Sequence, residues 1–212
     1  MTKVKICGIT NADDAQFAIS CGADYVGLIF APSKRRIIKE TAMRILKKTK
    51  NFNTYVGVFL NGRKKEIEEI CSSVGIRIVQ FHGEETPAFC NYFINRGYDV
   101  IKAFRIKNID SFDAVRQYEK VTKFLFDTFS IEEHGGTGKV FDWSLVKKID
   151  FLKDRDVFIS GGISADNAFE VIRALNPYAI DASSQLEIKP GVKDKGKVKQ
   201  LIEAVHGVKD DN

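Results

Sequence analysis

Residues 156–184 read DVFISGGISADNAFEVIRALNPYAIDASS and contain one complete strand–helix–strand unit. The apolar run at 157–159 predicts a short buried strand that ends in a Gly-Gly loop. Ser164 is a helix N-cap, and apolar side chains then recur with helical spacing over 168–175. A second strand is predicted at 179–183 and ends in paired serines. The stretch therefore predicts a right-handed β–α–β unit whose two loops of small residues lie at the same edge of the sheet.

The same alternation runs along the whole chain. Helical patterns with cap or stop residues lie between the strand patterns, and less regular ones cover 11–21, 39–48, 110–119 and 142–152. Eight such units fit either a closed barrel or an open doubly wound sheet, and eight complete units favour the barrel. An open sheet that binds a dinucleotide would show GxGxxG after its first strand, where this chain has CGIT at 7–10. We therefore expect one (β/α)8-barrel domain over residues 1–212, with strands at 3–7, 25–30, 54–60, 77–82, 99–104, 123–127, 156–160 and 179–183.

Composition excludes several classes of protein. Of the 212 residues, 44% are apolar and 29% are charged, which is too apolar for disorder and too charged for a membrane bundle. No apolar run reaches the roughly 18 residues of a membrane span, and the N-terminus has no secretory pattern, so we expect a cytoplasmic protein. The net charge of +5 fits a solvated surface or an anionic ligand. Because the cations are spread along the chain, nucleic acid is not an expected partner.

The spacing of the cysteines and histidines predicts no metal site. No two of the four cysteines have metal-ligand spacing, and the three histidines are scattered. Cys21, Cys71 and Cys90 lie in helical patterns, where we expect small buried side chains. Disulfides are not expected in a chain without a secretory signal.

Two of the strand ends carry residues suited to an anionic ligand and to proton transfer. Alternation along the first strand places Val4 and Ile6 against the helices and turns Cys7 into the barrel mouth. A thiol there, two residues beyond Lys5, could be held partly as thiolate, although an inert buried cysteine fits the same spacing. The loop after the second strand contains Arg35, whose planar guanidinium suits a carboxylate; a solvated basic loop is the alternative.

The middle strands offer a second group of candidates. Asp127 ends a Phe-Leu-Phe strand, where partial desolvation would raise the pKa of the carboxyl and keep a proton available near neutrality. His82 ends the fourth strand on the inward face, although a lone histidine is often structural. The glycine-rich loop at 135–139 could close over a ligand.

The last two strands end in loops of small residues. Gly161 and Gly162 follow the seventh strand, and Ser183 and Ser184 follow the eighth. In (β/α)8 barrels, the loops after these two strands commonly bind phosphate through backbone N–H groups. Two tight turns without a ligand are the alternative. Together, the strand ends predict a ligand with a phosphate at one end and a second anion at the other.

Over essentially its whole length the chain resembles the phosphoribosylanthranilate isomerases of tryptophan biosynthesis. That family is a (β/α)8 barrel that needs no cofactor. The motifs that carry the resemblance are KICGIT (5–10), GAD (22–24), VG (26–27), SKR (33–35), VGVF (56–59), QFHGEE (80–85), DT (127–128), GGTGK (135–139), FDW (141–143), SGGI (160–163) and DASS (181–184).

The resemblance implies an Amadori rearrangement of N-(5-phosphoribosyl)anthranilate to 1-(2-carboxyphenylamino)-1-deoxyribulose 5-phosphate. It implies that Asp127 is the general acid for the ring oxygen and that Cys7 is the base that removes the C2′ proton. Arg35, rather than Arg36, would hold the anthranilate carboxylate, and the last two loops would hold the phosphate. The loop after the second strand is one residue shorter than in many relatives, and the loop after Asp127 is one residue longer. Gln185 replaces a glycine that many relatives have after the paired serines.

Other readings stay open at this stage. ProFAR isomerase would use carboxylates as both acid and base, which Cys7 argues against. Indoleglycerol-phosphate synthase would need an inward catalytic lysine, for which Lys5 is a weak candidate. A phosphate-binding barrel without catalysis would not need both Cys7 and Asp127. The expected partner is a small phosphosugar anthranilate, and both a monomer and a homodimer are compatible with the sequence.

Overall fold

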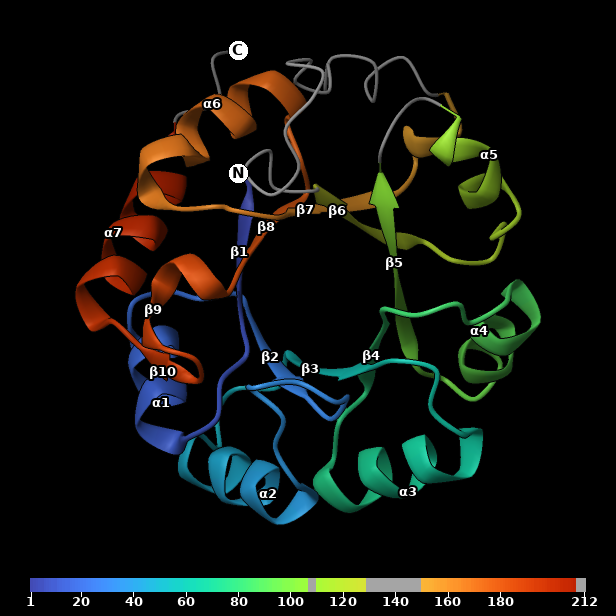
Figure 1. The fold of residues 1–212 in the computed structure, drawn as a ribbon, viewed down its shortest axis with the longest axis horizontal. Helices are drawn as coiled ribbons and strands as arrows, with labels where there is room; N and C mark the ends of the chain where they lie inside the picture. The colour runs from blue at the N-terminus through green and yellow to red at the C-terminus, as the bar shows by residue number, and fades with distance from the viewer. Residues whose placement is uncertain (107–109, 129–149, 209–212) are drawn as a thin grey trace.

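Eight parallel strands form a closed barrel in the computed structural model, which describes residues 1–106, 110–128 and 150–208 (Figure 1). Each strand pairs with the next, and β1 also pairs with β8, with Lys5 opposite Tyr25 on one side and Asp181 on the other. The predicted (β/α)8 barrel is confirmed, and every strand lies within two residues of its predicted bounds. The strands are β1 Lys3–Cys7, β2 Tyr25–Ile29, β3 Tyr55–Phe59, β4 Ile78–Phe81, β5 Asp99–Ile106, β6 Lys123–Thr128, β7 Asp156–Ser160 and β8 Ala179–Ala182.

Helices surround the barrel, and Figure 1 shows them as an outer ring. Their ends follow local sequence signals. Thr86 Oγ1 accepts a hydrogen bond from Phe89 N at the start of α4, Gly75 ends α3 at φ 86°, and Ser164 caps α6 in a capping box. The helices are α1 Ala12–Ser20, α2 Lys39–Lys48, α3 Lys64–Val74, α4 Pro87–Ile94, α5 Ser111–Arg116, α6 Ala165–Leu175 and α7 Lys195–His206. Within the described ranges, every helix is too short or too polar to cross a bilayer.

The apolar core has two layers. Val4 and Ile6 pack in the layer between the strands and the helices, whereas Cys7 belongs to the cluster inside the barrel with Tyr25 and Phe158. The Tyr25 and Phe158 rings meet edge to face at 5.5 Å and help to fill the interior. The predicted alternation along β1 is therefore confirmed, and it is what turns the Cys7 side chain inward.

Three features differ from the sequence-based expectations or extend them. Of the helix expected at 142–152, residues 142–149 lie outside the described residues, and Asp150–Leu152 form a 3₁₀ turn. Cys21, the C-cap of α1, packs against the core but is partly exposed instead of buried, whereas Cys71 and Cys90 are buried. A second 3₁₀ turn (Ser184–Leu186) and a two-stranded hairpin (β9 Glu187–Lys189, β10 Val192–Lys193) lie between β8 and α7 (Figure 1).

Candidate active site

Cys7 ends β1 with its side chain inside the barrel mouth and is 6% exposed. A Cβ atom on Gly27 of the neighbouring strand would lie 2.6 Å from Cys7 Sγ. That distance is shorter than real contacts allow, so glycine at position 27 makes room for the thiol. The sequence therefore provides an inward cysteine and a gap on β2 that accommodates it.

The electrostatic surroundings of Cys7 oppose a resident thiolate. Burial raises the pKa of the Cys7 thiol above its ordinary value of 9.0, although Lys5 and Lys193 act in the opposite direction. Lys5 Nζ, itself fully buried, donates to Asp181 Oδ1 at 2.9 Å. The expectation that Lys5 holds Cys7 partly as thiolate is thus not met in the unliganded site, because desolvation of the thiol and the Asp181 carboxylate offset the nearby cations.

Asp127 lies on β6 and meets residues from two other strands. Ser160 Oγ at the end of β7 donates to Asp127 Oδ1 at 3.3 Å, and His82 Nε2 lies 3.6 Å from Asp127 Oδ2. Gln80 Nε2 can only donate, and it lies 3.0 Å from His82 Nδ1, so His82 Nδ1 accepts. The ring proton of His82 is then on its own Nε2, which faces the Asp127 carboxylate. The Asp127 side chain keeps 32% of its surface exposed, so its desolvation is only partial. The structure thus brings the two candidates Asp127 and His82 together.

Arg35 reaches across β1 toward the segment after β8. Its Nε and Nη2 donate to the two carboxylate oxygens of Glu187, each at 2.7 Å. A Cβ atom on Gly8 (φ 75°) would lie 2.6 Å from Arg35 Cδ and 2.9 Å from Ser183 Oγ, so only glycine fits beneath this side chain. Arg36 is exposed. Arg35 is thus partly buried against Glu187 while Arg36 is exposed, and the contact of Arg35 with a substrate carboxylate stays a prediction.

The loops after β7 and β8 have the backbone expected of small-residue turns. Gly161 and Gly162 have φ values of 99° and 64°, a region that other residues rarely adopt. Ser183 Oγ is buried without a hydrogen-bond partner among the described residues, and Ser184 begins the short 3₁₀ turn. Gln185 is exposed. A phosphate-binding loop of this barrel offers a hydroxyl and a short helical turn after β8. Ser183 Oγ fits this, because it is buried and has no hydrogen-bond partner among the described residues.

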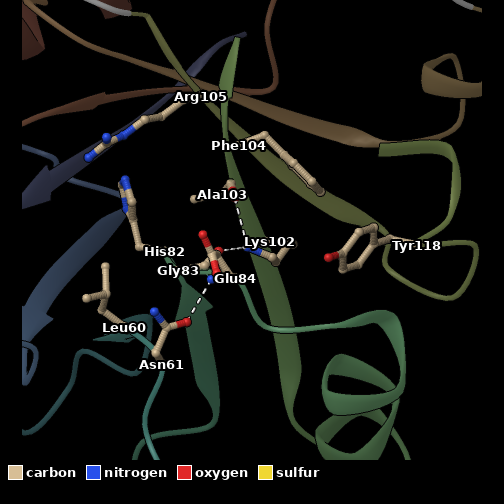
Figure 2. Close-up of a pocket in the computed structure, with 10 residues that line it drawn as sticks. All are labelled: Leu60, Asn61, His82, Gly83, Glu84, Lys102, Ala103, Phe104, Arg105 and Tyr118. Carbon is tan, nitrogen blue, oxygen red and sulfur yellow. Dashed lines mark hydrogen bonds between the residues drawn. The ribbon is translucent and has the colours of Figure 1, made fainter. Parts of the chain in front are cut away.

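A cavity of about 490 Å³ lies at the carboxyl ends of β4 and β5 (Figure 2). Its described lining includes His82 but not Cys7, Asp127 or Arg35. Figure 2 shows that the other lining side chains come from β5 and from the segments after β3, β4 and α5. Among the described residues, no group of three or more His, Cys, Asp or Glu side chains is arranged to hold a metal ion.

Two charged residues of the site, Glu187 and Lys193, were not predicted from the sequence. Glu187 and Lys193 face each other on β9 and β10, and Lys193 Nζ donates to Glu187 Oε1 at 3.1 Å. The Pro190-Gly191 pair between the two strands is a turn signal that could have predicted this hairpin. No sequence signal showed that the hairpin would meet Arg35.

Fold and site together define an enzyme of the (β/α)8-barrel class whose functional groups end the strands. Comparison with known proteins narrows the class. The family model of N-(5'phosphoribosyl)anthranilate (PRA) isomerase matches residues 4–204. A relative from Citrifermentans bemidjiense, named N-(5'-phosphoribosyl)anthranilate isomerase, is 40% identical over 203 residues, which cover 95% of this chain and 96% of the relative.

Solved structures agree with this assignment. Phosphoribosyl anthranilate isomerase from Thermotoga maritima superposes with a TM-score of 0.88 at 40% identity, covering 98% of this chain and 100% of that one. A phosphoribosyl anthranilate isomerase in complex with reduced 1-(o-carboxyphenylamino)-1-deoxyribulose 5-phosphate has a TM-score of 0.87 at 37% identity, with the same coverage. The chain belongs to the N-(5'-phosphoribosyl)anthranilate isomerase family, and the resemblance noted from its motifs is confirmed.

Proposed function

We propose that this chain catalyses the Amadori rearrangement of N-(5-phosphoribosyl)anthranilate to 1-(2-carboxyphenylamino)-1-deoxyribulose 5-phosphate in tryptophan biosynthesis. The observation that carries the proposal is the placement of a thiol and a carboxyl group, Cys7 and Asp127, at the ends of β1 and β6 in one barrel mouth. Strands β7 and β8 separate them, so a sugar ring between the two can be protonated from one side and deprotonated from the other.

The first step needs an acid near the furanose ring oxygen. We assign it to Asp127, whose carboxyl group donates a proton to that oxygen as the bond between C1′ and the oxygen breaks. The lone pair of the anthranilate nitrogen then forms an iminium with C1′. Ser160 and His82 hold the carboxyl group between them, which fixes its direction. His82, whose Nε2 lies 3.6 Å from Asp127 Oδ2, is the alternative acid.

The second step needs a base for the C2′ proton. We assign it to Cys7, whose thiolate takes this proton while the electron pair of the bond forms the enolamine, which then tautomerises to the ketone. Burial favours the thiol in the unliganded site. The positive iminium next to the thiol favours its ionised form, because an adjacent opposite charge lowers the pKa of an acid. The base is therefore formed when the intermediate that it must deprotonate is present.

Binding at the two ends of the substrate fixes the ring between Asp127 and Cys7. Arg35 would hold the anthranilate carboxylate by a two-pronged, charge-assisted contact. The backbone of Gly161 and Gly162 and the hydroxyls of Ser183 and Ser184 would hold the phosphate. Ser183 Oγ, which is buried and has no hydrogen-bond partner among the described residues, supports this placement.

The proposed function also indicates where the chain acts and what it binds. We propose that residues 1–212 form a single catalytic domain that acts in the cytoplasm as a monomer or homodimer, with a small phosphosugar anthranilate as its partner. The rearrangement as written consumes no second substrate and no cofactor, because the proton taken from C2′ and the proton given to the ring oxygen balance each other.

A turnover assay tests the proposed function. The purified chain is mixed with freshly prepared N-(5-phosphoribosyl)anthranilate, and the ketose product is identified by chromatography against an authentic standard, with Cys7→Ala as the inactive control. We expect the product with the wild-type chain only. Turnover of the ProFAR isomerase substrate without turnover of this one would contradict the proposal.

A further inference from the structure

The hairpin after β8 is attached to the segment that follows β1. Thr10 Oγ1 donates to Gly191 O in the hairpin turn, and Lys193 N donates to Asp14 Oδ2 at 2.9 Å. Strands β9 and β10 are short, and they bring Glu187 opposite Lys193. Both side chains are nearly buried, at 4% and 2% exposed. The hairpin therefore presents one carboxylate from a fixed backbone at the edge of the mouth.

The hydrogen bonds of Glu187 account for both of its carboxylate oxygens. Oε1 accepts from Arg35 Nε at 2.7 Å, from Lys193 Nζ at 3.1 Å and from Gly191 N at 3.3 Å. Oε2 accepts from Arg35 Nη2 at 2.7 Å. Two cations share one carboxylate here, so the cluster keeps an excess of positive charge that favours a further anion.

The contact with Glu187 uses only one edge of the Arg35 guanidinium. Nε and one N–H of Nη2 are committed, and no hydrogen bond between described residues uses Nη1. The edge formed by Nη1 and Nη2 can therefore still form a second two-pronged contact with a carboxylate. The Arg35 guanidinium also lies near enough to Cys7 for the two charges to interact.

We propose that Glu187 is a positioning residue, which holds Arg35 by one edge so that the other edge receives the aromatic carboxylate of the ligand. This inference rests on the proposed function and on Arg35 as the carboxylate contact. A fixed guanidinium loses little side-chain freedom when the ligand binds, so the contact costs less entropy than one made by a mobile arginine. Glu187 thereby contributes to affinity without touching the ligand.

The opposite role, a competitor that the ligand must displace, predicts the opposite sign. A competing Glu187 would weaken binding, and its removal would tighten it. The four hydrogen bonds to the Glu187 carboxylate favour the fixed arrangement, because Arg35 can accept the ligand without breaking any of them.

The test measures binding of two ligands by calorimetry. One is reduced 1-(o-carboxyphenylamino)-1-deoxyribulose 5-phosphate, and the other is its phenylamino counterpart without the carboxylate. We expect Glu187→Gln to weaken binding of the first by at least about tenfold, equivalent to 1.4 kcal/mol, and of the second by less than about twofold. Glu203→Gln, which removes a carboxylate from the exposed pair with Lys199, is the matched control and should change neither.

Each other outcome overturns the inference. An equal loss of affinity for both ligands would mean that Glu187 only maintains the fold of the hairpin. Tighter binding of the carboxylate ligand would mean that Glu187 competes with that ligand for Arg35. Unchanged affinity for both ligands would mean that Glu187 does not position Arg35. Glu187→Gln leaves Lys193 buried without its counter-ion and could unfold the chain, so Glu187→Gln/Lys193→Met is measured in parallel and should show the same carboxylate-dependent loss.

Failure of the proposed function is distinguishable from failure of this inference. A wild-type chain that binds the first ligand but does not isomerise the substrate contradicts the function alone. A wild-type chain that binds both ligands equally contradicts the carboxylate contact and with it the role of Glu187. A chain that binds neither contradicts both.

Discussion

Replacing Asp127 by asparagine separates the acid from the base in the proposed reaction. The amide keeps nearly the same shape and can still accept the hydrogen bond from Ser160 Oγ at 3.3 Å, so the barrel should fold. It cannot donate an acidic proton, and loss of a general acid typically lowers kcat by about 10²–10⁴-fold, or roughly 2.7–5.4 kcal/mol. We expect kcat to fall within that range with little change in KM.

The pH dependence of this variant follows from the burial of Cys7. With the acid removed, kcat/KM of Asp127→Asn should depend on the thiolate alone, whose pKa lies above its ordinary value of 9.0. The residual kcat/KM should therefore keep rising with pH, by about tenfold per unit well below that pKa, where the wild type should give a flatter, bell-shaped profile. Steady-state kinetics from pH 6 to about 9.5 measures both. A variant profile with the wild-type shape would mean that Asp127 is not the acid, and the role would pass to His82.

Three further predictions concern binding and stability. Arg35→Ala should raise KM at least about tenfold, because it removes the two-pronged contact with the substrate carboxylate. Arg36 is exposed, and Arg36→Ala should raise KM less than about threefold. Both variants are measured at low and high salt, and equal effects on KM would mean that the loop only supplies positive potential. Glu85→Ala should lower the free energy of unfolding in urea by about 3–5 kcal/mol, because it leaves the buried Lys102 ammonium, 3.3 Å away, without its counter-ion, and a loss below about 1 kcal/mol would contradict this. In the folded chain the pKa of Glu187 lies below its ordinary value of 4.5, owing to Arg35 and Lys193, which outweigh the opposing effect of burial. Its stabilisation is therefore complete above about pH 4.5 and is lost as the pH falls through the folded pKa, so unfolding free energies of wild type and Glu187→Gln should converge in acid.

Local patterns were enough to predict the barrel and the direction of its inward side chains. Alternation along β1 separated Cys7, which lies inside the barrel, from Val4 and Ile6, which pack against the helices. The Ser164 cap and the spacing that follows it defined α6. These features depend on residues close in sequence, which is why the chain alone reveals them.

Contacts between distant strands were beyond this reasoning. Arg35 and Glu187 are 152 residues apart in sequence, and nothing near either residue indicates the other. The contact of His82 with Asp127 likewise depends on how the ends of β4 and β6, which β5 separates in the barrel, converge. The direction of the Cys7 pKa shift depends on how completely the closed barrel buries the thiol, which alternation cannot quantify.

Release of a label from C2′ measures proton removal by Cys7 directly. Substrate deuterated at C2′ is incubated in ordinary water with the wild-type chain and with Cys7→Ser, and the deuterium that enters the solvent is measured as turnover proceeds. If Cys7 is the base, the wild-type chain releases the label in step with formation of the ketose. Cys7→Ser, with a hydroxyl that is a much weaker base at neutral pH, should release it at least about a hundredfold more slowly. Release by Cys7→Ser at the wild-type rate would contradict the assignment of Cys7 as the base.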